Sequence, residues 1–137
     1  MNGEETRHAR TKVDTLTREV LGYLAGDRSA ADGARIAGVS SAVFLDVADA
    51  FLQLVTSRAH TTRHRLGAAG PAQSASCVHA VTRYLSGTAS LRESARRAGV
   101  PGEWVARVSS ECISYMSRVS ARALVNARRA TASGNDA

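Results

Sequence analysis

The chain has 137 residues, a net charge of +6 and only 4% aromatic residues, a length that suits one domain or two small ones. No apolar run approaches the 18 residues or so of a membrane span, and the two cysteines are too few for a disulfide framework. No glycine-rich phosphate loop and no Ser-His-Asp arrangement is present, so we expect neither an enzyme nor a cofactor.

The basic charge is concentrated in the second half of the chain. Residues 69–137 carry nine basic and four acidic side chains, whereas residues 1–68 carry nine and eight. A basic balance favours a polyanionic partner such as nucleic acid, although an arginine-rich solvated surface gives the same composition. The polar start of the chain lacks the apolar core of a secretion signal, so we expect a cytoplasmic protein without membrane contact.

The first half of the chain predicts three helices after a flexible N-terminus at residues 1–11. Apolar residues at helical spacing indicate a helix over residues 12–24. A short helix is expected over residues 29–37, with Ser29 as its N-cap and Gly38 at its end. A long third helix begins at Ser40 or Ser41, and no helix breaker appears before Gly67. Its apolar stripe consists of Phe44, Val47, Phe51, Leu54 and Val55.

The second half predicts the same order of elements. Residues 66–76 contain glycine and proline and form a linker. Helices are expected over residues 77–85 and 90–98, where Ser90 caps the second helix and Glu93 completes a capping box. Another long helix begins at Gly102 or Glu103 and extends as far as residue 129, followed by a flexible tail at residues 130–137. Its apolar stripe consists of Val105, Val108, Cys112, Tyr115, Val119 and Ala123.

The two halves are copies of one sequence. Residues 20–39 align with residues 81–100 at a shift of 61 positions, and ten of these twenty pairs are identical. The sequence therefore predicts two domains, at residues 12–65 and 77–129. A unit of about 60 residues is marginally stable alone, so the copies are expected to pack on each other or on a second subunit. The apolar stripes of the long helices need a partner, and we expect a homodimer through them, with the other repeat's long helix as the alternative.

Both copies carry a pattern of small and apolar residues around a glycine turn. An alanine is followed after four residues by a glycine, then by an apolar residue, and then by apolar residues five and eight positions further along. The positions are Ala34, Gly38, Val39, Phe44 and Val47 in one copy, and Ala95, Gly99, Val100, Val105 and Val108 in the other. This pattern resembles the helix-turn-helix of DNA-binding proteins, and in style the units of transposases, phage DNA-packaging small subunits and sigma-like regulators.

The resemblance implies an all-α protein with two tandem trihelical helix-turn-helix repeats, each with a long third helix. It also implies a sequence-selective binder of double-stranded DNA, most simply a transcriptional regulator. The alternative is a helical adaptor module that binds a protein with the same fold and makes no DNA contact.

Helix-turn-helix proteins read bases with the residues that open the third helix, and their second helix crosses the phosphate backbone. In repeat two the resemblance assigns base reading to Gly102, Glu103, Arg107 and Ser110, with Arg107 suited to guanine. It assigns phosphate binding to Arg92, Arg96 and Arg97. Arg118 and Arg122, four residues apart on the last helix, share a face and are expected to extend this phosphate-binding patch. A solvated face is the alternative for these residues.

The equivalent face of repeat one comprises Ser40, Ser41, Leu45 and Asp46. A carboxylate in a phosphate-lined groove makes a poor DNA reader, so repeat one is expected to be a structural copy or a protein-docking face. Leu45, apolar on an exposed face, favours a protein partner there.

Four residues near the linker have side chains that can bind zinc: His60, His64, Cys77 and His79. Only one residue separates Cys77 from His79, whereas finger-type pairs are separated by about two to four, so no metal site is expected. Cys112 and Trp104 are expected to be core residues.

Overall fold

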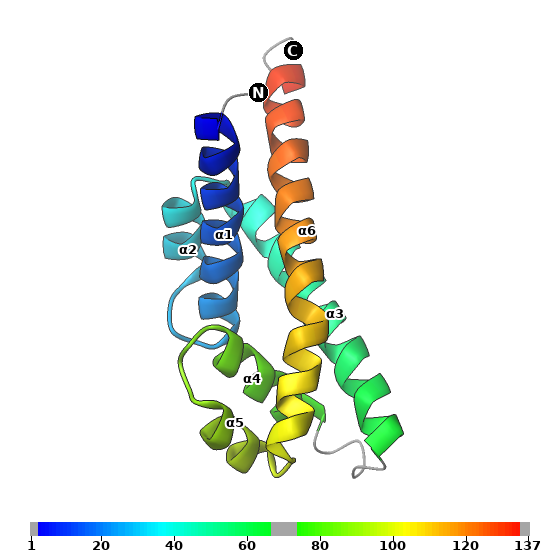
Figure 1. Ribbon diagram of the computed structural model, residues 1–137. Helices are drawn as coiled ribbons and strands as arrows, with labels where there is room; N and C mark the ends of the chain where they lie inside the picture. Colours follow the sequence, from blue (N-terminus) through cyan, green and yellow to red (C-terminus); the bar gives the residue numbers. More distant parts are fainter. Residues whose placement is uncertain (1–2, 67–73, 135–137) are drawn as a thin grey trace.

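Each repeat contributes three consecutive helices to the structure (Figure 1). The computed structural model describes residues 3–66 and 74–134, and within these residues it contains helices and no strand. The all-α prediction is therefore confirmed. Repeat one supplies α1 (Gly3–Leu24), α2 (Ala30–Ala37) and α3 (Ser41–Leu66), and repeat two supplies α4 (Ser74–Leu85), α5 (Leu91–Ala98) and α6 (Gly102–Gly134).

The short helices α2 and α5 begin and end with the same local devices. The hydroxyl oxygens of Ser29 and Ser90 each accept a hydrogen bond of 3.1 Å, from the N–H groups of Asp32 and Glu93. Gly38 and Gly99 close the helices in the left-handed conformation, with φ of 71° and 69°, which a residue without Cβ adopts at little cost. These boundaries match the predicted ones to within one residue. The Glu93 side chain, expected to complete a capping box, instead lies 3.3 Å from Nη2 of Arg97.

The outer ends of the chain are more helical than predicted. α1 begins at Gly3, so most of the segment expected to be a flexible N-terminus is helical, and α6 continues to Gly134 through most of the expected tail. Residues 3–11 include the helix formers Glu, Ala and Arg but no apolar periodicity, so a prediction based on periodicity misses them. Of the predicted linker, Leu66 ends α3 and residues 74–76 open α4, while residues 67–73 lie outside the described residues.

The two repeats are related by an approximate two-fold rotation. α1 packs on α6, and its counterpart α4 packs on α3, so the operation that takes α1 to α4 also takes α6 back to α3. Counterparts also pack directly on each other, α1 on α4 and α3 on α6. The hydroxyl of Thr88 donates to the carboxylate of Asp27, its counterpart 61 positions earlier, which places this hydrogen bond near the two-fold axis. The chain thus builds within itself the kind of isologous interface that joins two identical subunits.

The apolar stripes of the long helices meet in one core shared by both repeats. Phe44, Phe51, Trp104 and Val108 are fully buried in this cluster, as is Cys112. The long helices therefore cover each other within one chain, which was the alternative to coverage by a second chain. Phe44 and Trp104 confirm the expectation of aromatic residues buried in the first turns of α3 and α6.

The predicted apolar stripe of α6 is wrong at one position. Tyr115 is 41% exposed, and the next residue, Met116, is buried in its place. Both follow Cys112 at helical spacing, after three and four residues, and the direction from which α3 and α4 approach decides between them. Cys112 itself is in the core as predicted, and burial raises the pKa of its thiol to about 11, so the thiol stays protonated at neutral pH.

Repeat one holds a buried carboxylate that repeat two lacks. Glu19 on α1 is 2% exposed and pairs with the guanidinium of Arg28, while Nε of Arg18 lies 3.7 Å from its other oxygen. A Cβ on Gly22 would come within 2.8 Å of Nε of Arg28, so this glycine leaves room for the arginine to pass. The counterparts of Glu19 and Arg28 are two buried alanines, Ala80 and Ala89.

A second polar contact also departs from the internal symmetry. The hydroxyls of Thr17 on α1 and Ser120 on α6 form a buried hydrogen bond of 2.7 Å. Their counterparts in the second α4–α3 contact are Val78 and Ala59, both buried. Polar pairing at one interface thus corresponds to apolar packing at the other, and the two halves of the core have diverged in chemistry while keeping their geometry.

Length and apolarity decide whether a described helix could span a membrane. Across residues 3–66 and 74–134, no individual helix is both long enough and apolar enough to cross a membrane, and the test is met only by α2 taken together with α3 as far as His60, across a bend of 106°.

Candidate nucleic-acid interface

The two glycine turns join short helices to long ones. Three residues, Gly38 to Ser40, connect α2 to α3, and three residues, Gly99 to Pro101, connect α5 to α6. The α2–α3 pair bends by 106°, which falls within the range of about 90–120° between the two helices of a helix-turn-helix. α5 and the start of α6 lie together at the end of the molecule opposite the start of α1 (Figure 1).

The predicted base-reading residues occupy the first turns of α6. Glu103, Arg107 and Ser110 are exposed, whereas Gly102 is partly buried, and a Cβ on it would lie 4.0 Å from Cγ of Leu91. Nη2 of Arg107 lies 3.9 Å from Oε1 of Glu103, and the two side chains are 46% and 79% exposed. Such an exposed pair is worth little, so Arg107 can exchange it for a stronger acceptor.

The predicted phosphate-binding residues of α5 are exposed on a solvated helix surface. Arg92 and Arg96 are one helical turn apart and share a face. Neither forms an ion pair with any residue that the structure describes, whereas Arg97 pairs with Glu93. The side chains of Arg92 and Arg96 are therefore available to an external anion.

Arg118 and Arg122 lie further along α6 than the predicted base-reading residues. Arg118 lies 11 residues beyond Arg107, which corresponds to about 16 Å along the helix axis. With Tyr115 and Asp46, the two arginines line a groove of about 520 Å³ between α3 and α6. The guanidinium carbons of Arg58 and Arg118 lie 5.3 and 5.5 Å from the centre of the Tyr115 ring. No periodicity in the sequence indicates this cluster, because it joins residues from different repeats.

The equivalent face of repeat one is bordered by the second half of α6. Ser41, Leu45 and Asp46 are exposed, and the 40% exposure of Leu45 agrees with the prediction of an apolar residue on this face. Asp46 also lines the groove that holds Arg118 and Arg122. The Ser40 hydroxyl oxygen accepts a hydrogen bond of 3.1 Å from the N–H of Val43. The second repeat thus supplies a helix that stands beside the acidic face of the first.

The residues considered as zinc ligands do not come together in the part of the chain that the structure describes. No group of three or more His, Cys, Asp or Glu side chains within it is arranged to hold a metal ion. Cys77 is buried in the core, while His60 and His79 are exposed. The His64 side chain lies outside the described residues.

Comparison with known proteins finds no matching protein family, no similar curated protein and no similar solved structure.

Proposed function

We propose that the protein binds double-stranded DNA through a helix-turn-helix formed by α5 and α6, and that it acts as a sequence-selective transcriptional regulator. The observation that carries the proposal is the pair Arg92 and Arg96 on α5, exposed and without ion pairs among the described residues, together with the exposed Arg107 near the start of α6, the helix on which α5 packs. The α5 arginines are placed to hold phosphates, and Arg107 is placed to read a base edge.

Repeat one carries the opposite charge at the position that would read bases. The position equivalent to Arg107 is Asp46, a carboxylate that DNA phosphates repel, and the second half of α6 stands beside it. DNA contact is therefore assigned to repeat two alone. The apolar stripes of α3 and α6 cover each other, so they no longer require a second subunit. The homodimer expected from the sequence stays a prediction, which light scattering tests.

Two substitutions in repeat two are expected to affect DNA binding differently. Arg107→Ala should cost about 1–3 kcal/mol and relax the preference at one base pair, whereas Arg96→Ala should weaken binding to every sequence alike. Fluorescence anisotropy with a selected duplex and its single-base variants measures both effects. Arg35→Ala is the matched control, because Arg35 is the counterpart of Arg96 in repeat one, and it should leave affinity unchanged. Equal effects of Arg35→Ala and Arg96→Ala would contradict the assignment to repeat two.

A protein partner is the second candidate function, and one feature of α3 favours it. Leu45 and Leu52 are 40% and 42% exposed and lie seven residues apart, so they share one face of the helix. The exposed Asp49 lies between them. An exposed stripe with apolar and acidic side chains suits a basic amphipathic helix. If the protein binds no DNA, this stripe is the place to look for its partner.

A further inference from the structure

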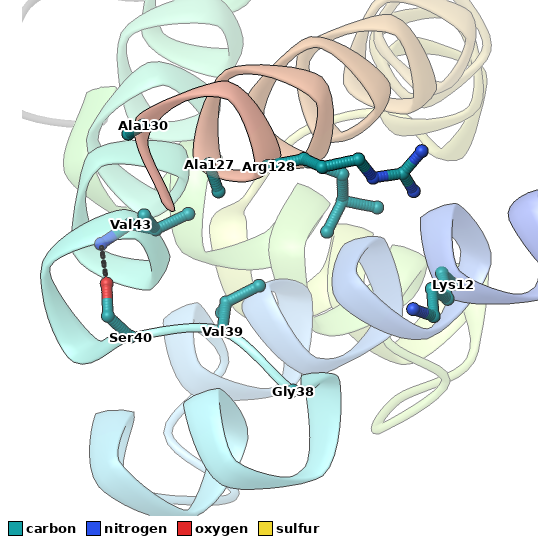
Figure 2. A pocket seen from close by; sticks show the side chains of 9 residues that line it. Lys12, Gly38, Val39, Ser40, Val43, Ala127, Arg128 and Ala130 are labelled. Carbon is teal, nitrogen blue, oxygen red and sulfur yellow. Dashed lines mark hydrogen bonds between the residues drawn. The ribbon is translucent and has the colours of Figure 1, made fainter. Parts of the chain in front are cut away.

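A cavity of about 370 Å³ lies beside the glycine turn of repeat one, where the second half of α6 passes over the start of α3 (Figure 2). This volume is within the range of pockets that hold small molecules, about 300–1,000 Å³. Its walls come from three parts of the chain that are distant in sequence: α1, the turn with the start of α3, and α6. None of the functional residues assigned to DNA binding lines it.

Two cationic side chains face the same side of the cavity. Lys12, the single lysine of the chain, comes from α1, and Arg128 comes from α6. In Figure 2 their charged ends lie on one side of the cavity, while Val43, Ala127 and Ala130 lie on the other. Neither cation forms an ion pair with a residue that the structure describes, although ion pairs occur elsewhere on these surfaces. The cavity thus has one cationic end and one apolar end.

Repeat two provides an internal comparison, because a larger side chain stands at the position equivalent to one of the lining residues. The counterpart of Val43 is Trp104, which is fully buried. The Ser40 hydroxyl donates to no residue that the structure describes, and its counterpart is Pro101, whose backbone has no donor. α3 ends at Leu66, the counterpart of Ala127, so among the described residues it has no equivalent of the α6 turn that carries Arg128. The cavity therefore arises where repeat one departs from its copy.

We propose that this cavity binds a small amphipathic anion, a carboxylate with a hydrocarbon body. The carboxylate pairs with Lys12 and Arg128, and the hydrocarbon body lies along Val43 and Ala127. A carboxylate satisfies the two cations, which have no ion pair among the described residues, and the hydrocarbon removes apolar wall from water at the other end. The proposal concerns a site separate from the α5–α6 face and does not depend on DNA binding.

Octanoate is the probe that tests the proposal, in an NMR titration of the ¹⁵N-labelled full chain at constant ionic strength. We expect saturable shifts of the amide signals of Gly38, Val39 and Val43. Acetate, which has the charge without the hydrocarbon, and octylammonium, which has the hydrocarbon with the opposite charge, should each bind at least about tenfold more weakly. Octylammonium binding as tightly as octanoate would overturn the proposal, because the cations would then have no part in recognition.

Variants with a matched charge change locate the site. Lys12→Gln with Arg128→Gln should weaken octanoate binding by about tenfold or more. Arg10→Gln with Arg129→Gln removes the same charge from neighbouring exposed positions outside the cavity, and it should leave binding unchanged. Equal weakening by the two double variants would overturn the proposal, since it would indicate a nonspecific effect of net charge.

A filled cavity should abolish binding even with both cations present. Val43→Trp introduces the residue that repeat two carries at this position and is expected to remove the saturable shifts. Circular dichroism verifies that the variant is folded, and Val43→Phe, which also carries an aromatic ring into the cavity, replaces it if it is not. Undiminished octanoate binding by a folded, filled variant would show that the probe binds elsewhere and that the proposal is wrong.

Discussion

Replacing Arg28 by alanine is expected to lower the free energy of unfolding by about 3 kcal/mol, because it leaves the Glu19 carboxylate buried without its main partner. Glu19 is only 3% exposed in its side chain, and the remaining cation, Arg18, is 67% exposed and 3.7 Å away. The Arg28 side chain is 35% exposed, so water replaces part of its contribution and the loss lies near the lower end of the range for a broken buried pair. Urea denaturation followed by circular dichroism should show a lower midpoint with an unchanged slope.

The internal repeat supplies a test of the mechanism behind this loss. Repeat two carries Ala80 and Ala89 at the equivalent positions, both buried. The double variant Glu19→Ala with Arg28→Ala should therefore be more stable than Arg28→Ala alone, since it removes the uncompensated charge. Arg35→Ala breaks an exposed pair with Asp32 and should change stability by no more than about 0.5 kcal/mol. A loss from Arg28→Ala as small as this control's would show that the buried pair contributes little.

Replacing Trp104 by alanine should cost about 3–5 kcal/mol, through loss of apolar burial and the cavity left behind. Trp104 is fully buried where α6 enters the shared core, and it is the chain's one tryptophan. Because its fluorescence disappears with the substitution, urea denaturation followed by circular dichroism is the measurement. The counterpart substitution, Val43→Ala, should cost clearly less, since Val43 is only partly buried beside a cavity.

The indole N–H of Trp104 allows the packing contribution to be separated from the polar one. This group is buried and has no hydrogen-bond partner among the described residues. Trp104→Phe keeps most of the apolar volume and removes the unpaired donor, so its cost should be less than about 1.5 kcal/mol. If Trp104→Phe were as damaging as Trp104→Ala, the indole N–H would have a role that the packing argument omits.

The turns of this protein could be predicted from its sequence because their determinants are local. A serine hydroxyl caps an adjacent amide, and a glycine ends a helix wherever a left-handed residue is needed, so Ser29, Ser90, Gly38 and Gly99 were placed correctly. The repeat strengthened each assignment by providing it twice. The helical ends at residues 3–11 and 130–134 were missed because helix propensity there carries no apolar periodicity.

The features that depend on the approach of distant helices could not be predicted. The choice of Met116 over Tyr115 as a core residue depends on the direction from which other helices pack. The division of the arginines into an α5–α6 face and a groove with Tyr115 depends on the crossing of α3 and α6. The approximate two-fold rotation follows from which helices pack together, and the sequence repeat alone is equally compatible with a simple translation.

The central claim, that repeat two binds DNA, is tested most directly by the salt dependence of affinity for a labelled duplex of random sequence. One phosphate contact from each of the three α5 arginines predicts a slope of about −2.7 in a plot of log affinity against log salt concentration. The affinity should then fall about 40-fold between about 50 and about 200 mM salt. The variant Arg92→Ala with Arg96→Ala lacks two of these contacts, so the magnitude of its slope should be smaller by about two. Binding with an unchanged slope in this variant, or no binding by the parent protein at low salt, would contradict the claim.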